Sequence, residues 1–547
     1  MNNNYFKLLR EGLSAELAIL NLEEKLRYMR MYQDLVVPDA NMAAAFVNAL
    51  IADADLPRSA EAQQAFFYFL QMAWQHQPLH RSILQALQNL RPTPQRQEHL
   101  AMLEKLDLSD AQWSQMQQCG APEEGSAPLL ALLRANPAHV GAANALLALE
   151  EKFPGSIEDW SSLFRCPHRM QSLWDYRLFL HYAALGRHAA ATEAWARLQG
   201  EYKLPLACQM AADNFALAGA TDMALALYAR ACAADPRLRP VARRMETLRH
   251  PPQAQEALVH QCRTAICLYS WNKGAVLEAT LRSLAASETA DNPVFVLLNG
   301  CTDGSAQRIE GLRDLFAGRS FTVITLPINI GAPAARNWLL HLPDVRACPY
   351  VAFMDDDVTV PANWLVRYLT VMEEDARTAV VGGKAVFPKE DGLAPGIQYF
   401  YRLVSLAKDG LLKLSVATPG QNVRDTGLYS FSRPCMNVMG CLHLLRTAAL
   451  REVGDFDIRY TPSQVDDLDH DLSTCLAGYQ IMYCGDVTCE HHQNSGVGVK
   501  RRPGLAQMGS IIGNDLKMTY KFAEKQSELL RISQELSTLP LPGAPTP

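Results

Sequence analysis

The chain has 547 residues, of which 49% are hydrophobic, and its formal net charge is −6 at pH 7. A chain of this length exceeds what a single hydrophobic core supports, so we expect about three domains. The weakly negative charge offers no basic field, and we therefore expect no nucleic acid partner.

The cysteines and the amino terminus bear on the cellular compartment. The 13 cysteines occur singly, with no CxxC pair, which is typical of a reducing compartment rather than a disulfide scaffold. The first 20 residues, "MNNNYFKLLREGLSAELAIL", lack the apolar segment of a signal peptide, and no run of about 18 apolar residues occurs. We expect a cytoplasmic protein without a transmembrane segment.

The amino-terminal part of the chain has the periodicity of successive helices. We predict an all-α domain over residues 1–250, since residues 15–247 are rich in Ala, Leu and Gln with apolar spacing i, i+3, i+4. Within it, "YAALGRHAAATEAWARL" (182–198) and "FALAGATDMALALYARACAADP" (215–236) align with one glycine over the other. These segments resemble tetratricopeptide repeats, clearest over 172–240, and a plain helical bundle is the alternative.

The composition and periodicity of the sequence change after the helical domain. A proline-containing linker over 251–262 leads into the apolar segments "TAICLYSW", "VFVLLN", "FTVITL" and "YVAFM", which read as strands. Helical patterns separate them over 275–286, 305–316 and 333–341. This alternation predicts an α/β domain over 263–500 with a mostly parallel, doubly wound sheet. A helical extension over 501–537 and a disordered tail over 538–547 complete the expected organisation.

Polar turns follow the predicted strands at the ends where open α/β sheets bind ligands. The first strand ends in "YSWNKG", the second in "NGCTDGS" and the fourth in the carboxylate run "DDD" of "YVAFMDDDVTVP". Three adjacent carboxylates repel one another, and desolvating them costs several kcal/mol unless a cation compensates. The run is either a solvated turn or a metal site.

Several segments together resemble one enzyme family. "SWNKG", "LNGCTDGS", "NIGAPAARN" and "FMDDDVTVPANWL" have the order and spacing of family 2 glycosyltransferases with the GT-A fold. "MGCLHLLRTAALREVGDFD", "VDDLDHDLSTCLAGYQIMYC" and "VTCEHHQNS" continue the resemblance, which covers about residues 262–496.

The resemblance implies a divalent metal ion. Asp355 and Asp357 take the outer positions of the family's DxD motif, and His491 aligns with its late histidine, with His492 as the alternative. Carboxylate oxygens suit Mg²⁺ or Mn²⁺, which then bridges the phosphates of a nucleotide sugar. A zinc site in the segment with Cys484 and Cys489 is a weaker interpretation, because no second ligand pair has zinc-site spacing.

The resemblance also implies contacts to the nucleotide-diphosphate sugar donor. The residues at these positions are Trp271, Asn272, Asn299, Asp303, Arg336, Asn337, Asp355 and Asp356. The chain departs from the family at Leu298, where members usually have an acidic residue that helps to read the nucleotide base. The base specificity therefore stays open.

A second pair of carboxylates is implied to be catalytic. Asp466 and Asp467 take the places of the family's Glu-Asp pair, and Asp467 is the expected general base for the acceptor hydroxyl. A base opposite the leaving diphosphate gives single displacement with inversion of the anomeric centre. Asp466 stands where Glu is usual, so it is the alternative base.

Our leading hypothesis from the sequence is a metal-dependent, inverting glycosyltransferase of the hexosyltransferase type. Its helical repeats would hold a protein acceptor, for example a surface-appendage subunit. The Gln-x-x-Arg-Trp motif of processive members is absent, so we expect transfer of one or a few sugars. The alternatives are a noncatalytic repeat scaffold with a relic sugar-nucleotide domain, and a nucleotidyltransferase, which would need a basic glycine-rich loop after the first strand.

Overall fold

The computed structural model describes residues 13–388, 394–408, 412–417, 423–492 and 505–539. The chain forms two compact units, the first running to residue 248 and the second beginning at Arg249. The first unit also takes in Ala394 and Thr426–Leu428. Most of the predicted tail and the predicted end of the α/β domain at residue 500 lie outside the described residues.

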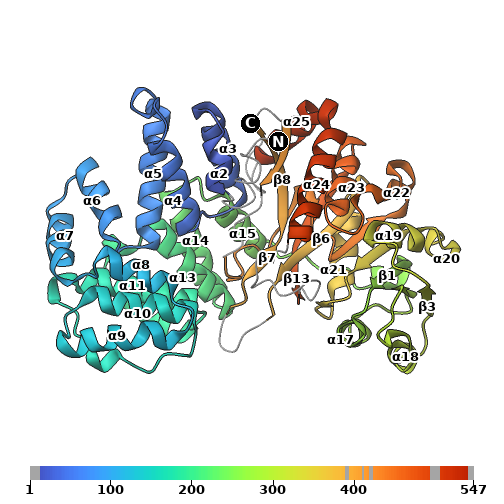
Figure 1. The fold of residues 1–547 in the computed structure, drawn as a ribbon, viewed down its shortest axis with the longest axis horizontal. Coiled ribbons are helices and arrows are strands. Elements are labelled where there is room, and N and C mark those ends of the chain that lie inside the picture. The colour runs from blue at the N-terminus through green and yellow to red at the C-terminus, as the bar shows by residue number, and fades with distance from the viewer. Residues whose placement is uncertain (1–12, 389–393, 409–411, 418–422, 493–504, 540–547) are drawn as a thin grey trace. The chain divides into compact units, whose positions relative to one another are not determined.

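The first unit is built from helices, as the sequence predicts (Figure 1). Its α-helices are α2 (Leu13–Ala18), α3 (Leu22–Leu35), α4 (Ala40–Ile51), α5 (Ala60–His76), α6 (Arg81–Leu90), α7 (Pro94–Leu106), α8 (Asp110–Gln118), α9 (Pro122–Ala135), α10 (Val140–Lys152), α11 (Gln171–Ala184), α12 (His188–Arg197), α13 (Pro205–Leu217), α14 (Thr221–Ala234) and α15 (Arg239–Arg249). Short 3-10 turns are η1 (Leu56–Arg58), η2 (Ser161–Leu163), η3 (His168–Met170) and η4 (Gly200–Tyr202).

The two aligned sequence segments form successive helical hairpins, α11–α12 and α13–α14. The turn of each hairpin has a glycine in the left-handed region, Gly186 with φ 68° and Gly219 with φ 78°. Ala191 and Ala224, at equivalent positions of α12 and α14, are both fully buried. Small residues at these positions let the helices of each hairpin approach closely, so the first unit is consistent with a helical-repeat domain.

One carboxylate of the first unit is fully buried. Asp213 on α13 accepts hydrogen bonds from the Tyr228 hydroxyl at 2.5 Å, the Gln209 amide at 2.5 Å and the Thr426 hydroxyl at 2.6 Å. Burial raises the pKa of Asp213 to about 7. The segment around Thr426 thus belongs structurally to the helical unit, although it lies far along the chain.

The second unit contains a mixed, mostly parallel sheet in the order β10-β13-β6-β12-β4-β1-β2-β3. The pairs β1–β2, β1–β4, β2–β3 and β6–β13 are parallel, whereas β12 runs antiparallel between β4 and β6. The predicted α/β class is confirmed.

The strands and helices of this unit have the following bounds. The strands are β1 (Thr264–Ser270), β2 (Val294–Asn299), β3 (Phe321–Leu326), β4 (Tyr350–Met354), β5 (Val358–Thr359), β6 (Thr378–Val386), β7 (Ile397–Tyr399), β8 (Tyr401–Lys408), β9 (Leu412–Ala417), β10 (Ser432–Cys435), β11 (Asn437–Val438), β12 (Leu442–Arg446) and β13 (Gln480–His491). The helices are α16 (Leu258–Gln261), α17 (Gly274–Ala285), α18 (Ser305–Glu310), η5 (Arg313–Phe316), α19 (Ala332–Leu340), α20 (Pro343–Arg346), α21 (Trp364–Glu374), α22 (Thr447–Val453), η6 (Ile458–Tyr460), α23 (Asp466–Leu476), α24 (Leu505–Lys521), η7 (Ala523–Lys525) and α25 (Gln526–Ser537). The predicted helix over 305–316 is split, because α18 ends before Gly311, a poor helix former.

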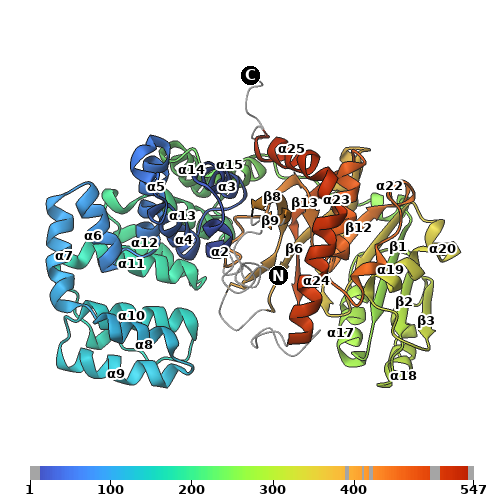
Figure 2. The same cartoon turned by 45° about the horizontal axis from the view of Figure 1, so that its top comes forward.

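Helices cover both faces of the parallel strands (Figures 1 and 2). Alternate residues of β1 point to opposite faces, so Leu268 packs in the main core with Leu281 of α17 and Leu369 of α21. Tyr269, on the other face, lies beside Arg336 of α19. The parallel strands therefore end between two layers of helices, where the polar turns emerge.

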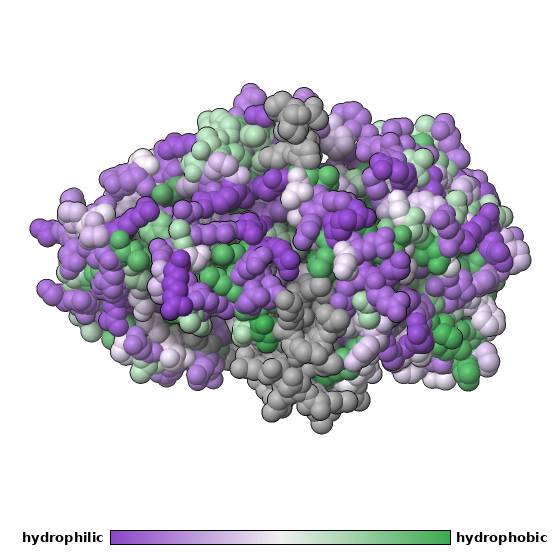
Figure 3. Space-filling model, turned by 90° about the horizontal axis from the view of Figure 1, so that it is seen from above, coloured by the Kyte–Doolittle hydropathy of each residue, from purple (hydrophilic) through white to green (hydrophobic). Residues whose placement is uncertain are grey.

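Strands β8, β9 and β11 form a separate three-stranded sheet. Helix α24 lies beside α23 in both ribbon views, and the Lys521 ammonium of α24 lies 2.6 Å from the Asp469 carboxylate of α23. On the face shown in Figure 3, hydrophilic side chains predominate and hydrophobic ones form small groups. Among the helices of the described residues, none has the length and apolarity needed to cross a membrane.

Candidate active site

The carboxylate run after β4 forms a turn whose backbone is held by neighbouring segments. The Asp355 amide donates to the Cys441 carbonyl at 2.8 Å, and the Asp357 carbonyl accepts from the His492 amide at 2.9 Å. The Thr280 hydroxyl of α17 donates to the Asp356 carbonyl at 2.9 Å. The turn is fixed from three directions, so its carboxylates have defined positions at the end of the sheet.

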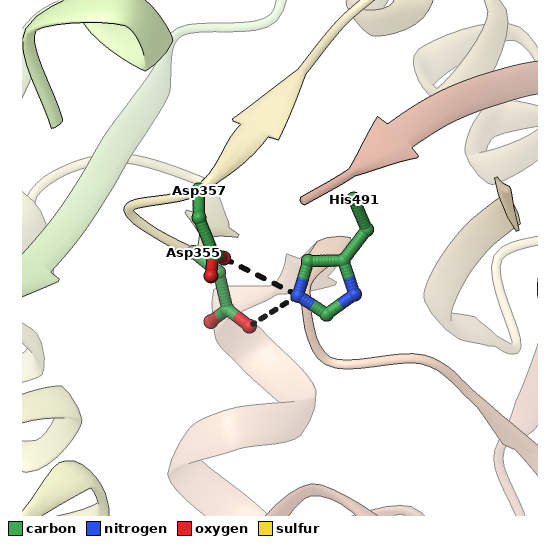
Figure 4. Close-up of side chains that lie close together, drawn as sticks. All are labelled: Asp355, Asp357 and His491. Carbon is green, nitrogen blue, oxygen red and sulfur yellow. Dashed lines mark ion pairs between the residues drawn. The ribbon is translucent and has the colours of Figure 1, made fainter. Parts of the chain in front are cut away.

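Asp355 and Asp357 meet His491, the last residue of β13 (Figure 4). The imidazole Nε2 lies 3.2 Å from Asp357 Oδ1 and 4.0 Å from Asp355 Oδ2. One ligand atom from each residue lies within 4.8 Å of the others, and this is the only such group among the described residues. Two carboxylates and an imidazole in this arrangement are suited to a divalent ion.

The electrostatics of this group favour a compensating cation. Burial, with smaller contributions from Asp357 and Asp356, raises the pKa of Asp355 to about 7. Burial lowers the pKa of His491, but Cys441, Asp357 and Asp355 outweigh it and raise that pKa to about 9. Both shifts favour bound protons when no cation is present, and a divalent ion would compete with those protons for the same atoms.

His491 and His492 have different environments. The His492 Nε2 atom lies 2.9 Å from the Thr359 hydroxyl, and the ring is exposed, whereas His491 is buried beside the two aspartates. Gln398 of β7, which sequence reasoning missed, contacts His491 twice. Its amide nitrogen donates to the His491 carbonyl at 2.6 Å, and its oxygen lies 3.0 Å from Nδ1. A carbonyl only accepts, so the amide orientation is fixed and Nδ1 donates, which directs Nε2 toward the aspartates.

Asp356 is not part of the metal-binding group. Its carboxylate accepts from the Ser270 hydroxyl at 2.6 Å and pairs with the Lys273 ammonium at 2.8 Å. The Lys273 ammonium also lies 3.6 Å from Asp357 Oδ2. Lys273 was not among the predicted site residues, although it stands within the "SWNKG" turn after the first strand. Its proximity to two of the three carboxylates places a fixed positive charge in the site.

The four predicted donor contacts after β1 and β2 have different surroundings. Trp271 is 53% exposed at the end of β1, whereas Asn272 has φ 53° and its side chain accepts from the Thr302 amide at 2.7 Å. Asn299 is buried and accepts from the Ile330 amide at 2.9 Å. Asp303 accepts from the Gly274 amide at 3.0 Å. The last three side chains bond to adjacent turns, whereas Trp271 leaves a large hydrophobic ring exposed.

Arg336 connects the two acidic motifs. It is buried on α19, where its guanidinium forms an ion pair with Asp466 and lies 3.8 Å from Asp355 Oδ1. Burial lowers its pKa, but Tyr269, Asp466 and other nearby groups outweigh this and raise the pKa above its usual range. Arg336 therefore stays charged. Asn337, by contrast, exchanges two hydrogen bonds with the backbone of Phe456 and braces that loop.

Asp466 and Asp467 begin helix α23, where the helix dipole favours negative charge. Asp466 is buried against Arg336, whereas Asp467 is half-buried and accepts from the Gly440 amide at 3.0 Å. The two preceding residues, Gln464 and Val465, have φ 78° and 75°. Such values cost roughly 1–3 kcal/mol for each residue and persist only where the surroundings enforce them. The helix start is thus held in a strained conformation.

Gly440 was also missed as a site residue. A Cβ atom there would lie 2.8 Å from both the Cβ and the Oδ2 of Asp467. The adjacent Cys441 carbonyl accepts from Asp355. Gly440 and Cys441, the two residues before β12, therefore contact one acidic motif each. At position 440 only a glycine leaves room for the Asp467 carboxylate.

Among the described residues, the thiols near His491 form no metal-ligating group with it. Cys484 and Cys489 are buried, and the core of the sheet includes both. The structure gives no support to the zinc interpretation.

Part of the sequence matches a known protein family, and part of the fold is similar to solved structures. Residues 265–446 match the profile of Glycosyl transferase family 2. No significant match to a curated protein sequence was found. Solved structures with similarity include GalNAc-T7 with UDP, GalNAc and Mn²⁺, at 12% identity over 42% of this chain and 44% of that chain, with TM-score 0.33.

Two further similar structures are a mannosyltransferase and a staphylococcal protein. The mannosyltransferase PcManGT from Pyrobaculum calidifontis, in complex with GDP-Man and Mn²⁺, is 15% identical over 61% of this chain and 81% of that chain, with TM-score 0.35. TarS of S. aureus is 17% identical over 42% of this chain and 36% of that chain, with TM-score 0.30. The chain thus spans less than half the length of GalNAc-T7 and of TarS. Residues 265–446 of this chain are a glycosyl transferase family 2 domain.

Proposed function

We propose that this protein transfers a sugar from a nucleotide-diphosphate sugar to an acceptor hydroxyl, with inversion of the anomeric centre and with a divalent ion. The observation that carries the proposal is the group of Asp355, Asp357 and His491 at the end of β4, within a family 2 domain. Asp467 lies near by in the fold, because Gly440 and Cys441 bond to it and to Asp355 respectively.

The donor set of this group fits Mn²⁺ or Mg²⁺. Its atoms are carboxylate oxygens and one imidazole nitrogen, and Gln398 presents that nitrogen to the carboxylates. When bound, the ion supplies positive charge that offsets the charge developing on the departing diphosphate. The Lys273 ammonium adds a fixed charge beside Asp357.

The residues of the chain have distinct roles in the proposed reaction. Asp467 takes the proton from the acceptor hydroxyl at a carboxylate oxygen while that hydroxyl displaces the diphosphate in line. The ion pair of Asp466 with Arg336 supports Asp467 rather than Asp466 as the base, since Asp466 is already engaged. Trp271 offers an exposed ring to the nucleotide, and Asn299, Asp303 and Asn337 support the site by bracing its loops.

We further propose that the helical unit presents a protein acceptor, such as a surface-appendage subunit, in the cytoplasm. The successive hairpins α11–α12 and α13–α14 support a repeat surface of the kind that holds peptides. Intact-mass spectrometry after incubation with donor and candidate acceptors tests this. Transfer to proteins supports the idea, whereas transfer to free saccharides or lipids alone contradicts it.

Two variants test the reaction itself. Asp357→Ala should abolish Mn²⁺-dependent binding of UDP and GDP, measured by calorimetry, because it removes a metal ligand. Asp467→Asn should leave that binding intact but lower nucleoside diphosphate release from UDP- and GDP-linked hexoses by about 10²–10⁴-fold, the usual contribution of a positioned base. Asp375, which is half-buried and pairs with Arg377, provides the matched control Asp375→Asn.

Three results would contradict the proposal. The metal assignment fails if Asp357→Ala binds nucleotide with Mn²⁺ as the unmodified protein does. The base assignment fails if Asp467→Asn turns over normally. Retention of the anomeric configuration, measured by NMR on the product, would exclude a single displacement.

A further inference from the structure

Helix α24, which lies outside the matched family segment, places one buried amide against the loop before α23. Asn514 is 1% exposed. Its Nδ2 atom lies 3.1 Å from the Tyr460 carbonyl, 3.0 Å from the Ser463 carbonyl and 3.1 Å from the Gln464 carbonyl. The Lys517 ammonium donates to Asn514 Oδ1 at 3.1 Å. An ammonium group only donates, so the amide is oriented with its nitrogen toward the carbonyls.

These three carbonyls belong to the loop that leads into the proposed base. The loop ends in Gln464 and Val465, both with positive φ, and Asp466 and Asp467 follow at once. Ser463 and Gln464 are themselves exposed, so core packing does not hold them. A backbone in the left-handed region needs other contacts to maintain it, and the amide of Asn514 supplies them.

The loop has a second anchor on its other side. The Pro462 carbonyl accepts from the Ala332 amide, the first residue of α19, at 2.8 Å. The loop is therefore fixed between α19 and α24. Helix α19 also carries Arg336, the partner of Asp466, so this anchor affects Asp466. Asn514 instead bonds to Gln464 of the strained turn and to Ser463 beside it.

We propose that Asn514 is a positioning residue for the transfer reaction, because its carboxamide holds the strained turn that aims Asp467. The inference rests on the proposed role of Asp467 as the general base. Asn514 acts through the backbone and touches neither donor nor metal. Helix α24 is thus a functional part of the active site rather than an appendage to the domain.

The test uses the full chain with Asn514→Asp, which keeps the shape of the side chain but directs an acceptor at three carbonyls. Release of nucleoside diphosphate from UDP- and GDP-linked hexoses should fall by about 10–100-fold in kcat, since a misplacement of about 1 Å costs about 10²-fold. Calorimetric binding of UDP and GDP with Mn²⁺ should change less than twofold, because the Asp355 turn is anchored at Cys441 instead.

A matched control comes from the same helix. Thr519 is 5% exposed and donates only to the Asp515 carbonyl within α24, at 2.8 Å. Thr519→Val should therefore keep kcat within twofold. A second variant, Asn514→Ser, retains a donor that reaches fewer carbonyls, so its kcat should lie between those of the unmodified protein and Asn514→Asp.

A double-mutant cycle with Asp467→Asn separates this role from a general effect. If Asn514 acts through Asp467, Asn514→Asp should cause less than a twofold further loss in the Asp467→Asn background. The proposal is overturned if the two losses multiply, if kcat is unchanged, or if both Asn514 variants lose nucleotide binding together with activity. Normal turnover by Asp467→Asn alone would instead refute the proposed base, and this variant is measured first.

Discussion

Gly440→Ala should be a severe change for catalysis and a mild one for donor binding. The added Cβ atom would lie 2.8 Å from both the Cβ and the Oδ2 of Asp467, and ordinary contact begins at 3.4 Å, so Asp467 must move by about 0.6 Å. Gly440 is not one of the described glycines with a positive φ, so alanine introduces no backbone strain there. With about 10²-fold lost for 1 Å of misplacement, we expect kcat to fall by about 10–100-fold.

The assay for this variant separates chemistry from binding. Nucleoside diphosphate release gives kcat, and calorimetry with Mn²⁺ and UDP or GDP gives nucleotide affinity, which should stay within twofold. Gly513→Ala is the control, because a Cβ atom there meets nothing within 4 Å and alanine favours a helix. Unchanged kcat in folded Gly440→Ala would refute the reasoning, since Asp467 would then tolerate displacement or would not be the base.

Two further predictions concern charge. Lys273→Met leaves Asp356 buried without its ammonium partner, which costs about 3–5 kcal/mol for a fully buried pair and less here, because the Lys273 side chain is 19% exposed. The unpaired Asp356 carboxyl has a raised pKa in the folded variant, which therefore binds a proton that the unfolded chain releases, and its stability falls as pH rises. The loss in free energy of unfolding, measured with urea, should be larger at pH 8 than at pH 5. An equal loss at the two pH values would contradict this. Mn²⁺ binding at pH 7 should release more than one proton, because the pKa values of His491 and Asp355 are about 9 and about 7. The affinity for Mn²⁺ should therefore fall as pH falls, by roughly tenfold per pH unit between pH 9 and 7. Calorimetry in two buffers of different ionisation enthalpy measures the protons, and binding without proton release would show that these side chains are not the ligands.

The parallel strands could be predicted from the sequence because each is a short apolar segment bounded by turn residues. The segments "VFVLLN", "FTVITL" and "YVAFM" match β2, β3 and β4. Their common direction brings their carboxyl ends to one edge, so the placement of Asp355 and Asp357 followed from topology. The antiparallel strand β12 was not predicted, because its pattern does not reveal which neighbours it joins.

The supporting residues of the site could not be predicted, because their contacts join distant parts of the chain. Gln398 is 93 residues from His491, and Arg336 is 130 residues from Asp466. Gln398 is a polar residue in an otherwise ordinary segment, and nothing local distinguishes it from surface residues. Arg336 was expected to contact the donor, but its ion pair with Asp466 could not be foreseen from the sequence. Asn514 lies on a helix that the sequence placed outside the transferase domain, so only the fold reveals its contact with the loop before α23.

The adjacency of Gly440 and Cys441 has a consequence for motion. The Cys441 carbonyl bonds to the metal-binding turn and the Gly440 amide bonds to Asp467, so both acidic motifs are attached to adjacent residues of one backbone segment. We therefore expect a displacement of that short segment to move both motifs in the same direction and to change their separation little. The separation of the Asp355 turn and Asp467 would then respond little to fluctuations of the surrounding loops. Hydrogen exchange at the Asp355 and Gly440 amides should be slow and should rise together on heating.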